Sequence, residues 1–389
     1  MKINDVRPHR YIIDTKNPIT SIQPSINQVS PSSRRVEVLI VEIETSTGEI
    51  GYGEAMTSAG AELVNSSTAP ICYKIINSLI KPGIIGAEIG DIDFLWTKMN
   101  KLAGYHGMGG LLLDAISGVD TAIWDILGKE RKQPISKIIN RDSKNKIKVY
   151  ASKIPGVGAT HNLYSFEKNI RNTKMQGFKG IKIGGGLGIE NDVLSVRKAK
   201  EILGKEVDVM IDIFGAYSRE VALNLVARIN NLDLEWVECP IDPFDFDGYV
   251  ELSKNMSGKI GLDPVPEINC LKKMINTSQK FVPLIDVTRD GGVTAFKNVA
   301  EYCNIAGANL SVHSGWAVTA VGIAASLQMA ASFNNIHWME FRSQFGDNPF
   351  IVDITKHSFM PKRGFVDVPQ KPGIGIDLNL EKMSEFEVK

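Results

Sequence analysis

The chain of 389 residues is longer than a typical single domain, so its length favours two domains. Hydrophobic residues make up 43% of it and charged residues 23%, a composition typical of a globular protein with a large buried core. The 44 lysines and arginines balance the 44 aspartates and glutamates, and the absence of a net positive charge argues against nucleic acid as the main partner.

Cysteine spacing and hydropathy indicate the cellular localisation of the protein. The cysteines are scattered with no Cys-x-x-Cys pair, so we expect reduced thiols and neither a disulfide framework nor a zinc site. The first residues contain no apolar core of a signal peptide. The most apolar stretch, 317–331, is interrupted by Gln328 and is too short to span a membrane, so we expect a buried helix there. These features predict a soluble, cytoplasmic protein.

The N-terminal third combines strand and helix patterns. The polar run 15–35 predicts a mobile loop between strands, and 36–55 alternates apolar and charged residues around a turn at 46–48, which is typical of an antiparallel hairpin. From about residue 69 to 129 the apolar spacing becomes helical, with Gly128 near the stop. Strands followed by helices predict a small α+β domain.

The remainder repeats a strand and helix unit. Segments with helical spacing, such as 191–203 and 218–229, separate short β-branched runs. Eight such units favour a closed parallel barrel, although strand count alone does not exclude a doubly wound open sheet. We expect the turn-rich tail to return to the first domain. The predicted strands are 147–152, 179–184, 207–212, 234–238, 259–263, 281–286, 308–313 and 336–340.

A polar residue stands at or near the C-terminal end of each predicted strand. In a parallel barrel these ends converge on one mouth, where barrel enzymes place their active sites. A single carboxylate after a strand is usually a helix N-cap. Carboxylates at the ends of four consecutive strands, however, would concentrate negative charge, which is unfavourable unless a cation is bound among them. The residues are Ser152, Lys182, Asp212, Glu238, Asp263, Asp286, His313 and Glu340.

Two groups within this set suggest particular chemistry. Asp212, Glu238 and Asp263 offer three hard oxygen ligands on successive strands, which suits Mg²⁺, whereas zinc would call for nitrogen or sulfur. Asp286 and His313 end the next two strands. An Asp bonded to one imidazole nitrogen fixes the tautomer and makes the other nitrogen a better base. The alternative for His313 is a core histidine with its hydrogen bonds satisfied.

Lys182 lies in a glycine-rich segment, 177–188. The glycines match neither GxGxxG nor a P-loop, so a turn is the better interpretation than a phosphate cradle. Lys182 directed into the mouth could pair with a substrate carboxylate. The alternative is an ordinary solvated lysine at the end of a strand.

The chain resembles the enolase superfamily, in particular its mandelate racemase subgroup, which contains many acid-sugar dehydratases. The resemblance runs nearly end to end and implies an N-terminal α+β capping domain (1–128), a modified TIM barrel of type (β/α)7β (129–355), and a C-terminal segment (356–389) that returns to the cap. It also implies a homo-oligomer, a dimer or an octamer. The motifs are VEIETSTGEIGYGEA, AISGVDTAIWDILGK, GFKGIK, MID, WVECP, GLD, LIDVTRDGGVT, SVHSG and VPQKPGIGI.

The resemblance assigns roles to the strand-end residues. It implies that Asp212, Glu238 and Asp263 bind Mg²⁺, and that the Asp286–His313 dyad removes the proton α to a carboxylate.

Lys182 matches the first lysine of the family's Lys-x-Lys strand, and Glu340 matches an acid that hydrogen-bonds the substrate carboxylate. Lys182 and a protonated Glu340 would help the metal to stabilise the ene-diolate as its charge develops.

Two departures from the family pattern reduce the number of reactions that we expect from this chain. Gly184 replaces the second lysine, and Phe214 stands where relatives often have Asn or His. Without a second base, two-base racemisation is disfavoured, and a one-sided dehydration to a 2-keto-3-deoxy acid remains. Candidates for the general acid are Lys153, Tyr217 and protonated His313. The alternatives are an epimerase or cycloisomerase of the same superfamily, and a relative that only binds a ligand.

The dyad histidine also bears on the substrate. In this subgroup it faces the α-proton of 2R acids, so the resemblance implies a 2R aldonate such as D-gluconate, D-galactonate, D-xylonate or L-arabinonate. We expect the loop 15–35 and the segment 105–110 to contribute to specificity by closing over the barrel mouth.

Overall fold

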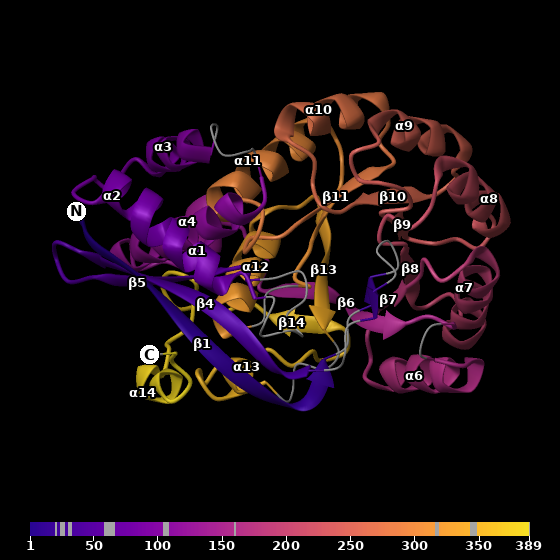
Figure 1. The fold of residues 1–389 in the computed structure, drawn as a ribbon, viewed down its shortest axis with the longest axis horizontal. Coiled ribbons are helices and arrows are strands. Elements are labelled where there is room, and N and C mark those ends of the chain that lie inside the picture. Colours follow the sequence, from indigo (N-terminus) through magenta and orange to yellow (C-terminus); the bar gives the residue numbers. More distant parts are fainter. Residues whose placement is uncertain are drawn as a thin grey trace.

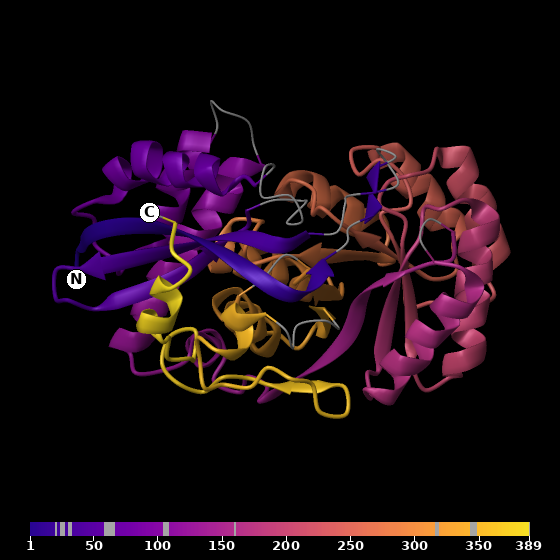
Figure 2. The same ribbon diagram turned by 60° about the horizontal axis from the view of Figure 1, so that its bottom comes forward.

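The computed structural model describes residues 1–19, 22–23, 28–29, 33–57, 67–103, 109–158, 161–315, 319–342 and 348–388. An N-terminal sheet with its helices lies beside a barrel of strands surrounded by helices (Figure 1). The C-terminal segment runs back alongside the N-terminal sheet (Figure 2). The fold class expected from the sequence is confirmed.

The N-terminal sheet is antiparallel and packs closely on one long helix. Its order is β1 (Ile3–Ile19), β4 (Ser33–Thr45) and β5 (Ile50–Ala55), so the predicted hairpin is confirmed. Helix α4 (Leu111–Glu130) lies directly against β5. The two backbones are so close that a Cβ added at Gly53 would lie only 2.0 Å from the carbonyl oxygen of Gly118. Glycine at this position therefore permits an approach that no other residue would allow.

The helical stretch predicted from residue 69 to 129 is confirmed, but it is broken into several helices. They are α1 (Ala69–Ile75), the π-helical turn η3 (Ile76–Ile80), α2 (Lys81–Ile84), α3 (Ile92–Ala103) and α4.

The prediction of a loop over residues 15–35 is wrong for part of that run. Strand β1 continues to Ile19, and β2 (Ile22–Gln23) pairs with β3 (Gln28–Val29). In the order of the sheet β1 stands at one edge beside β4, and an edge strand tolerates a proline such as Pro18. The rest of the run lies outside the described residues.

Within the described residues, eight parallel strands pair in chain order, and the last pairs with the first, so the barrel is closed. This excludes the doubly wound alternative. The strands are β6 (Lys146–Pro155), β7 (Gly180–Gly184), β8 (Asp208–Asp212), β9 (Trp236–Glu238), β10 (Lys259–Leu262), β11 (Phe281–Ile285), β12 (Leu310–Val312) and β13 (Ile336–Arg342).

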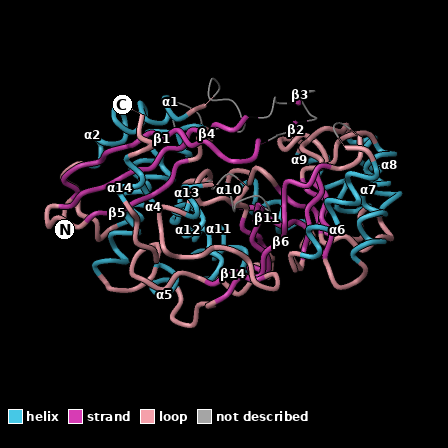
Figure 3. Tube along the Cα trace, turned by 90° about the horizontal axis from the view of Figure 1, so that it is seen from below, coloured by secondary structure: helices cyan, strands magenta, loops and turns pink. Residues whose placement is uncertain are grey.

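One long helix follows each of the first seven barrel strands, as a (β/α)7β barrel requires, and α6, α7 and α8 lie outside the strands (Figure 3). Helix α12 is buried along its whole length, as predicted for the apolar stretch. No helix among the described residues is long and apolar enough to cross a membrane. The helices are α6 (Leu163–Met175), α7 (Ile189–Leu203), α8 (Arg219–Ile229), α9 (Phe246–Asn255), α10 (Ile268–Thr277), α11 (Gly292–Ile305) and α12 (Ala320–Ser332).

The C-terminal segment joins the barrel and the N-terminal sheet. β14 (Phe365–Asp367) pairs antiparallel with β6, after which the chain passes α14 (Leu380–Ser384) and reaches β1. There the N–H of Val388 donates to the carbonyl oxygen of Arg10 at 2.8 Å. The remaining short helices are α5 (Ile135–Ile139) and α13 (Pro349–Val352).

The barrel interior is filled beneath its mouth by large side chains: Tyr150, Met210, Trp236, Val282, Leu284 and Trp338. The polar residues at the strand ends therefore stand on an apolar floor that shields them from water on one side.

Candidate active site

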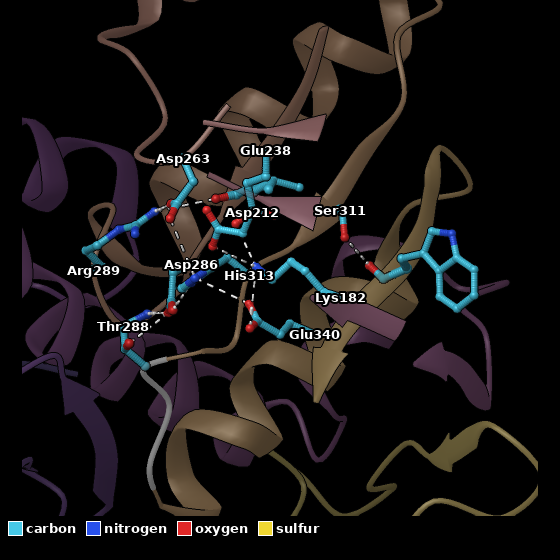
Figure 4. Close-up of polar contacts among 12 residues, drawn as sticks. Lys182, Asp212, Glu238, Asp263, Asp286, Thr288, Arg289, Ser311, His313 and Glu340 are labelled. Carbon is cyan, nitrogen blue, oxygen red and sulfur yellow. Dashed lines mark hydrogen bonds and ion pairs between the residues drawn. The ribbon is translucent and has the colours of Figure 1, made fainter. Parts of the chain in front are cut away.

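The barrel brings the predicted strand-end residues together at its mouth (Figure 4). Lys182, Asp212 and Glu238 come from β7, β8 and β9, and all three side chains are buried. His313 directly follows β12, and Glu340 lies in β13. Charged groups this deeply buried need partners of opposite charge.

Lys182 stands at the centre of the carboxylates. Its Nζ lies 2.6 Å from Oε1 of Glu238, 3.6 Å from Oε1 of Glu340 and 3.7 Å from Oδ2 of Asp212. Burial alone would lower the pKa of Lys182, but Glu238 and Glu340 outweigh it and raise that pKa well above its usual value. The ammonium therefore keeps its charge and can pair with a further anion in the mouth.

Asp212 and Glu238 each accept a further hydrogen bond from a neighbouring N–H group. The backbone N–H of Phe214 donates to Oδ1 of Asp212 at 2.9 Å, and Nε1 of Trp236 donates to Oε2 of Glu238 at 3.0 Å. Burial raises the pKa of Asp212 to about 6, and burial together with the charge of Asp212 raises the pKa of Glu238. Both shifts have the direction expected for buried carboxylates that lie close together.

Arg289 is a charged residue of the site that the sequence reasoning missed. Its guanidinium lies 2.7 Å from Oδ1 of Asp263 and also pairs with Asp290. Burial would raise the pKa of Asp263, but Arg289 and His313 hold it below its usual value. The available signal was the arginine of the TRDGG segment, which follows β11 as the acids follow their own strands.

His313 and Asp286 form the expected pair. Nδ1 of His313 lies 2.8 Å from Oδ2 of Asp286, while Oδ1 of Asp286 accepts hydrogen bonds from the backbone N–H and the hydroxyl of Thr288. Because both oxygens of Asp286 are engaged, the ring is fixed with Nε2 toward the mouth, 3.3 Å from Oε2 of Glu340 and 3.8 Å from Oδ2 of Asp263.

The charges at this end of the site shift the pKa values of His313 and Glu340. Burial would lower the pKa of His313, but Asp263, Glu340 and the bond to Asp286 raise it. For Glu340, burial is outweighed by Lys182, His313 and Lys153, which hold its pKa far below the usual range. With these three cations facing it, the carboxylate of Glu340 favours its charged form in this arrangement, and the protonated form that the resemblance implies stays a prediction for the loaded site.

A pocket of about 750 Å³, counted to its open mouth, lies over these residues, and Lys153 lines it. A register shift between Ala151 and Ile154 marks a bulge in β6 that contains Lys153, whose φ is +61°. A bulge changes the direction of the side chain it carries.

Tyr217 does not line the pocket: its hydroxyl accepts a hydrogen bond from the N–H of Gly188 and donates one to Asp192. Residues 104–108, which include Tyr105, lie outside the described residues.

The donors suit a hard divalent cation, since Asp212, Glu238 and Asp263 offer only carboxylate oxygens. Across the described ranges, however, no three such donors form a ready cage. The reason is visible in the ion pairs: Lys182 holds Glu238 and Arg289 holds Asp263. A cation bound by all three carboxylates would compete with Lys182 and Arg289 for the oxygens that they hold.

Both parts of the chain match known sequence families. Residues 12–140 match the mandelate racemase / muconate lactonizing enzyme N-terminal domain, and residues 165–383 match the enolase C-terminal domain-like family.

Individual relatives align over most of the chain. It is 27% identical over 368 residues to the arabinonate dehydratase of Saccharolobus solfataricus, with 91% of each chain covered. It is 25% identical to the D-galactarolactone cycloisomerase of Agrobacterium fabrum, covering 100% of this chain and 99% of the other. The crystal structure of the 3,6-anhydro-D-galactonate cycloisomerase from Zobellia galactanivorans superposes with a TM-score of 0.81, at 25% identity and with 100% of both chains covered.

Proposed function

The chain belongs to the enolase superfamily and, within it, to the mandelate racemase and muconate lactonizing enzyme family; on this premise we propose that it dehydrates a sugar acid to a 2-keto-3-deoxy acid. The observation that carries the proposal is the fixed position of one base, His313, in the pocket lining. His313 is held by Asp286 with Nε2 toward the mouth, whereas Gly184 offers no second base. The arabinonate dehydratase among the relatives supports the same reaction class.

In the proposed first step, Nε2 of His313 takes the proton from the carbon next to the substrate carboxylate. Asp286 stabilises the imidazolium that forms and keeps the ring in place, as a carboxylate partner does for other catalytic histidines. Removing this proton places further negative charge on the carboxylate, so the step requires positive charge where the carboxylate binds.

Lys182 supplies part of that charge, since its ammonium is buried at the base of the pocket. Mg²⁺, which we propose is held by Asp212, Glu238 and Asp263, would act as a Lewis acid on the substrate carboxylate. Glu340 lies within 3.6 Å of both Lys182 and His313, a position from which it orients the two side chains.

In the second step the hydroxyl on the β-carbon leaves. The C–O bond breaks, the hydroxyl takes a proton and departs as water, and the resulting enol rearranges to the 2-keto acid. Protonated His313 and Lys153 are the proposed general acids, because both line the pocket. Tyr217 is no longer a candidate, because its hydroxyl bonds to Asp192 outside the pocket lining.

An epimerase or cycloisomerase is the second candidate. It is favoured by the position of Lys153, a second proton carrier in the pocket, and by the two cycloisomerases among the relatives. The two candidates share the first step and differ in where the next proton goes.

The test is incubation with Mg²⁺ and a panel of 2R and 2S aldonic acids in D₂O, followed by proton NMR. The panel includes D-gluconate, D-galactonate, D-xylonate and L-arabinonate. Dehydration predicts loss of the C2 proton and new C3 methylene signals from 2R acids. Deuterium at C2 without a new product would favour the second candidate, and turnover of only 2S acids would contradict the assignment of His313 to the 2R face.

A further inference from the structure

Gly184 and Phe214 are adjacent in the pocket. A Cβ added at Gly184 would lie 3.6 Å from Cε2 of Phe214, which is ordinary van der Waals contact. The aromatic ring therefore covers the space into which a longer side chain at position 184 would extend. The lack of a side chain at Gly184 therefore leaves room for the ring of Phe214.

Phe214 lies across the pocket from the base. In the closed eight-stranded barrel, β8 is four strands from β12 in either direction, so the two strands face each other. Phe214 comes two residues after β8 and His313 directly after β12, and both line the pocket. An acid bound with its α-proton toward His313 would thus turn its other face toward Phe214.

The large apolar side chains of the pocket lining lie on that side, together with Lys153, Lys182 and Asp212. Ile154, Pro155 and Leu187 line the same pocket as Phe214, and we call these four residues the apolar wall. The charged lining residues come from β7, from the ends of β8, β10, β12 and β13, and from Lys153. The opposite side, from β10 to β13, contributes only charged side chains among the described lining residues, so the apolar ones are confined to the side of Phe214.

The backbone holds Phe214 firmly. Its φ is +55°, a conformation that residues other than glycine and asparagine seldom adopt. Its N–H donates to Oδ1 of Asp212, and the following N–H, of Gly215, donates to the carbonyl oxygen of Cys239 at 2.7 Å. A strained conformation fixed on both sides is typical of a functional site.

We propose that Phe214 determines specificity, and that the apolar wall selects sugar acids that present C–H groups, not hydroxyls, on the face turned away from His313. A hydroxyl against the wall would lose its bond to water without gaining a partner, which is costly. A C–H face would pack against the ring. Deoxygenated or ring-closed acids fit this description better than an open chain with hydroxyls on both faces. The inference rests on the proposed function only for the orientation of the acid at His313.

The test measures binding separately from turnover. In a His313→Asn background, which cannot abstract the proton, calorimetry with Mg²⁺ gives the affinities for 2-hydroxyhexanoate and D-gluconate. Both have six carbons and a 2-hydroxyl, but only D-gluconate is hydroxylated along its chain. Phe214→Asn makes the wall polar and suits the positive φ, so the fold is not threatened. Phe214→Leu is the matched apolar control.

With Phe214 or Phe214→Leu, we expect 2-hydroxyhexanoate to bind more tightly than D-gluconate. Phe214→Asn should shift the ratio of the two affinities toward D-gluconate by about tenfold. An unchanged ratio would overturn the inference, as would failure of both acids to bind to every variant. A shifted ratio in a protein that dehydrates no acid of the panel would support the apolar wall and count against the proposed function alone.

Discussion

At the scale of single residues, the proposed mechanism depends most on His313. Replacing it with alanine removes the group that accepts the α-proton, and we expect exchange of that proton to slow by about 10²- to 10⁴-fold. The matched control is His337→Ala, since His337 is the second residue of β13, at the other end of the barrel, and bonds to Asn309. The measurement is the rate of C2 deuteration in D₂O. A normal rate in a folded His313→Ala protein would remove this residue from the mechanism.

The same histidine predicts the dependence of the reaction on pH. Burial favours the neutral ring, but the charges of Asp263 and Glu340 and the bond to Asp286 raise the pKa of His313 above 6.5. Only the neutral ring accepts a proton, so kcat/KM should be high above that raised pKa and fall as the pH drops through it. A pH–rate profile checks the sign: activity that is flat or rises toward about pH 5 would contradict it.

The acids, the lysine and the histidine could be predicted from sequence because each stands at or near the end of a strand in a regular series of strand and helix units. Arg289 could not, since it lies in a loop and its importance comes from a contact with Asp263, which is 26 positions away. The cations that face Glu340 could not be predicted either, for the same reason. A carboxylate's protonation state depends on the cations that surround it in space, and the chain order does not reveal them.

At the scale of elements, a carboxylate of the N-terminal sheet caps a barrel helix. Oε2 of Glu54, in β5, accepts hydrogen bonds from the N–H and hydroxyl of Thr319 and from the N–H of Gly322, at the start of α12. That helix has no acidic residue in its first turn, so Glu54 provides the negative charge that a helix N-terminus favours.

Glu54→Ala should therefore lower the free energy of unfolding by about 2 kcal/mol, because it leaves buried N–H groups without their acceptor. Glu54→Gln keeps an acceptor oxygen but not the charge, so its loss should be smaller. Urea unfolding of the three proteins measures the order. Equal stability of wild type and Glu54→Ala would show that Glu54 does not stabilise α12.

Element positions were predictable where periodicity alone determines them. The eight barrel strands were found because short apolar runs alternate with amphipathic helices. The continuation of β1 to Ile19 was not, because its sequence is polar and contains proline, and its strand conformation comes from pairing with β4. The bulge in β6 also has no sequence signature, although it turns Lys153 into the pocket.

At the scale of the whole molecule, helix α4 of the N-terminal domain is hydrogen-bonded to the barrel helix α11. Asp120 of α4 accepts hydrogen bonds from the N–H and hydroxyl of Thr294 at 2.8 and 2.7 Å, and Trp124 donates to the same hydroxyl. Thr294 lies in the first turn of α11, the helix that follows Asp286. The contact therefore fixes the segment that carries the acid of the dyad. Such contacts, like closure of the barrel, depend on residues far apart in the chain.

The C-terminal segment provides the second connection, and its removal is the last prediction. Met383 of α14 is buried, the N–H of Ile12 donates to the carbonyl oxygen of Phe386 at 2.9 Å, and the ring of Phe386 packs edge-on against Phe350. Deleting residues 378–389 removes this buried surface and the bonds to β1. We expect the free energy of unfolding to fall by about 3–5 kcal/mol.

The deletion should leave kcat unchanged at temperatures where the protein stays folded, because no residue of this segment lines the pocket within the part of the chain that the structure describes. Calorimetric unfolding and turnover, measured on the same preparation, separate the two effects. Met383→Leu is the control, since it keeps the volume and should cost less than about 1.5 kcal/mol. A deletion that lowered kcat without lowering Tm would mean that the segment acts on the site and not on the connection between the domains.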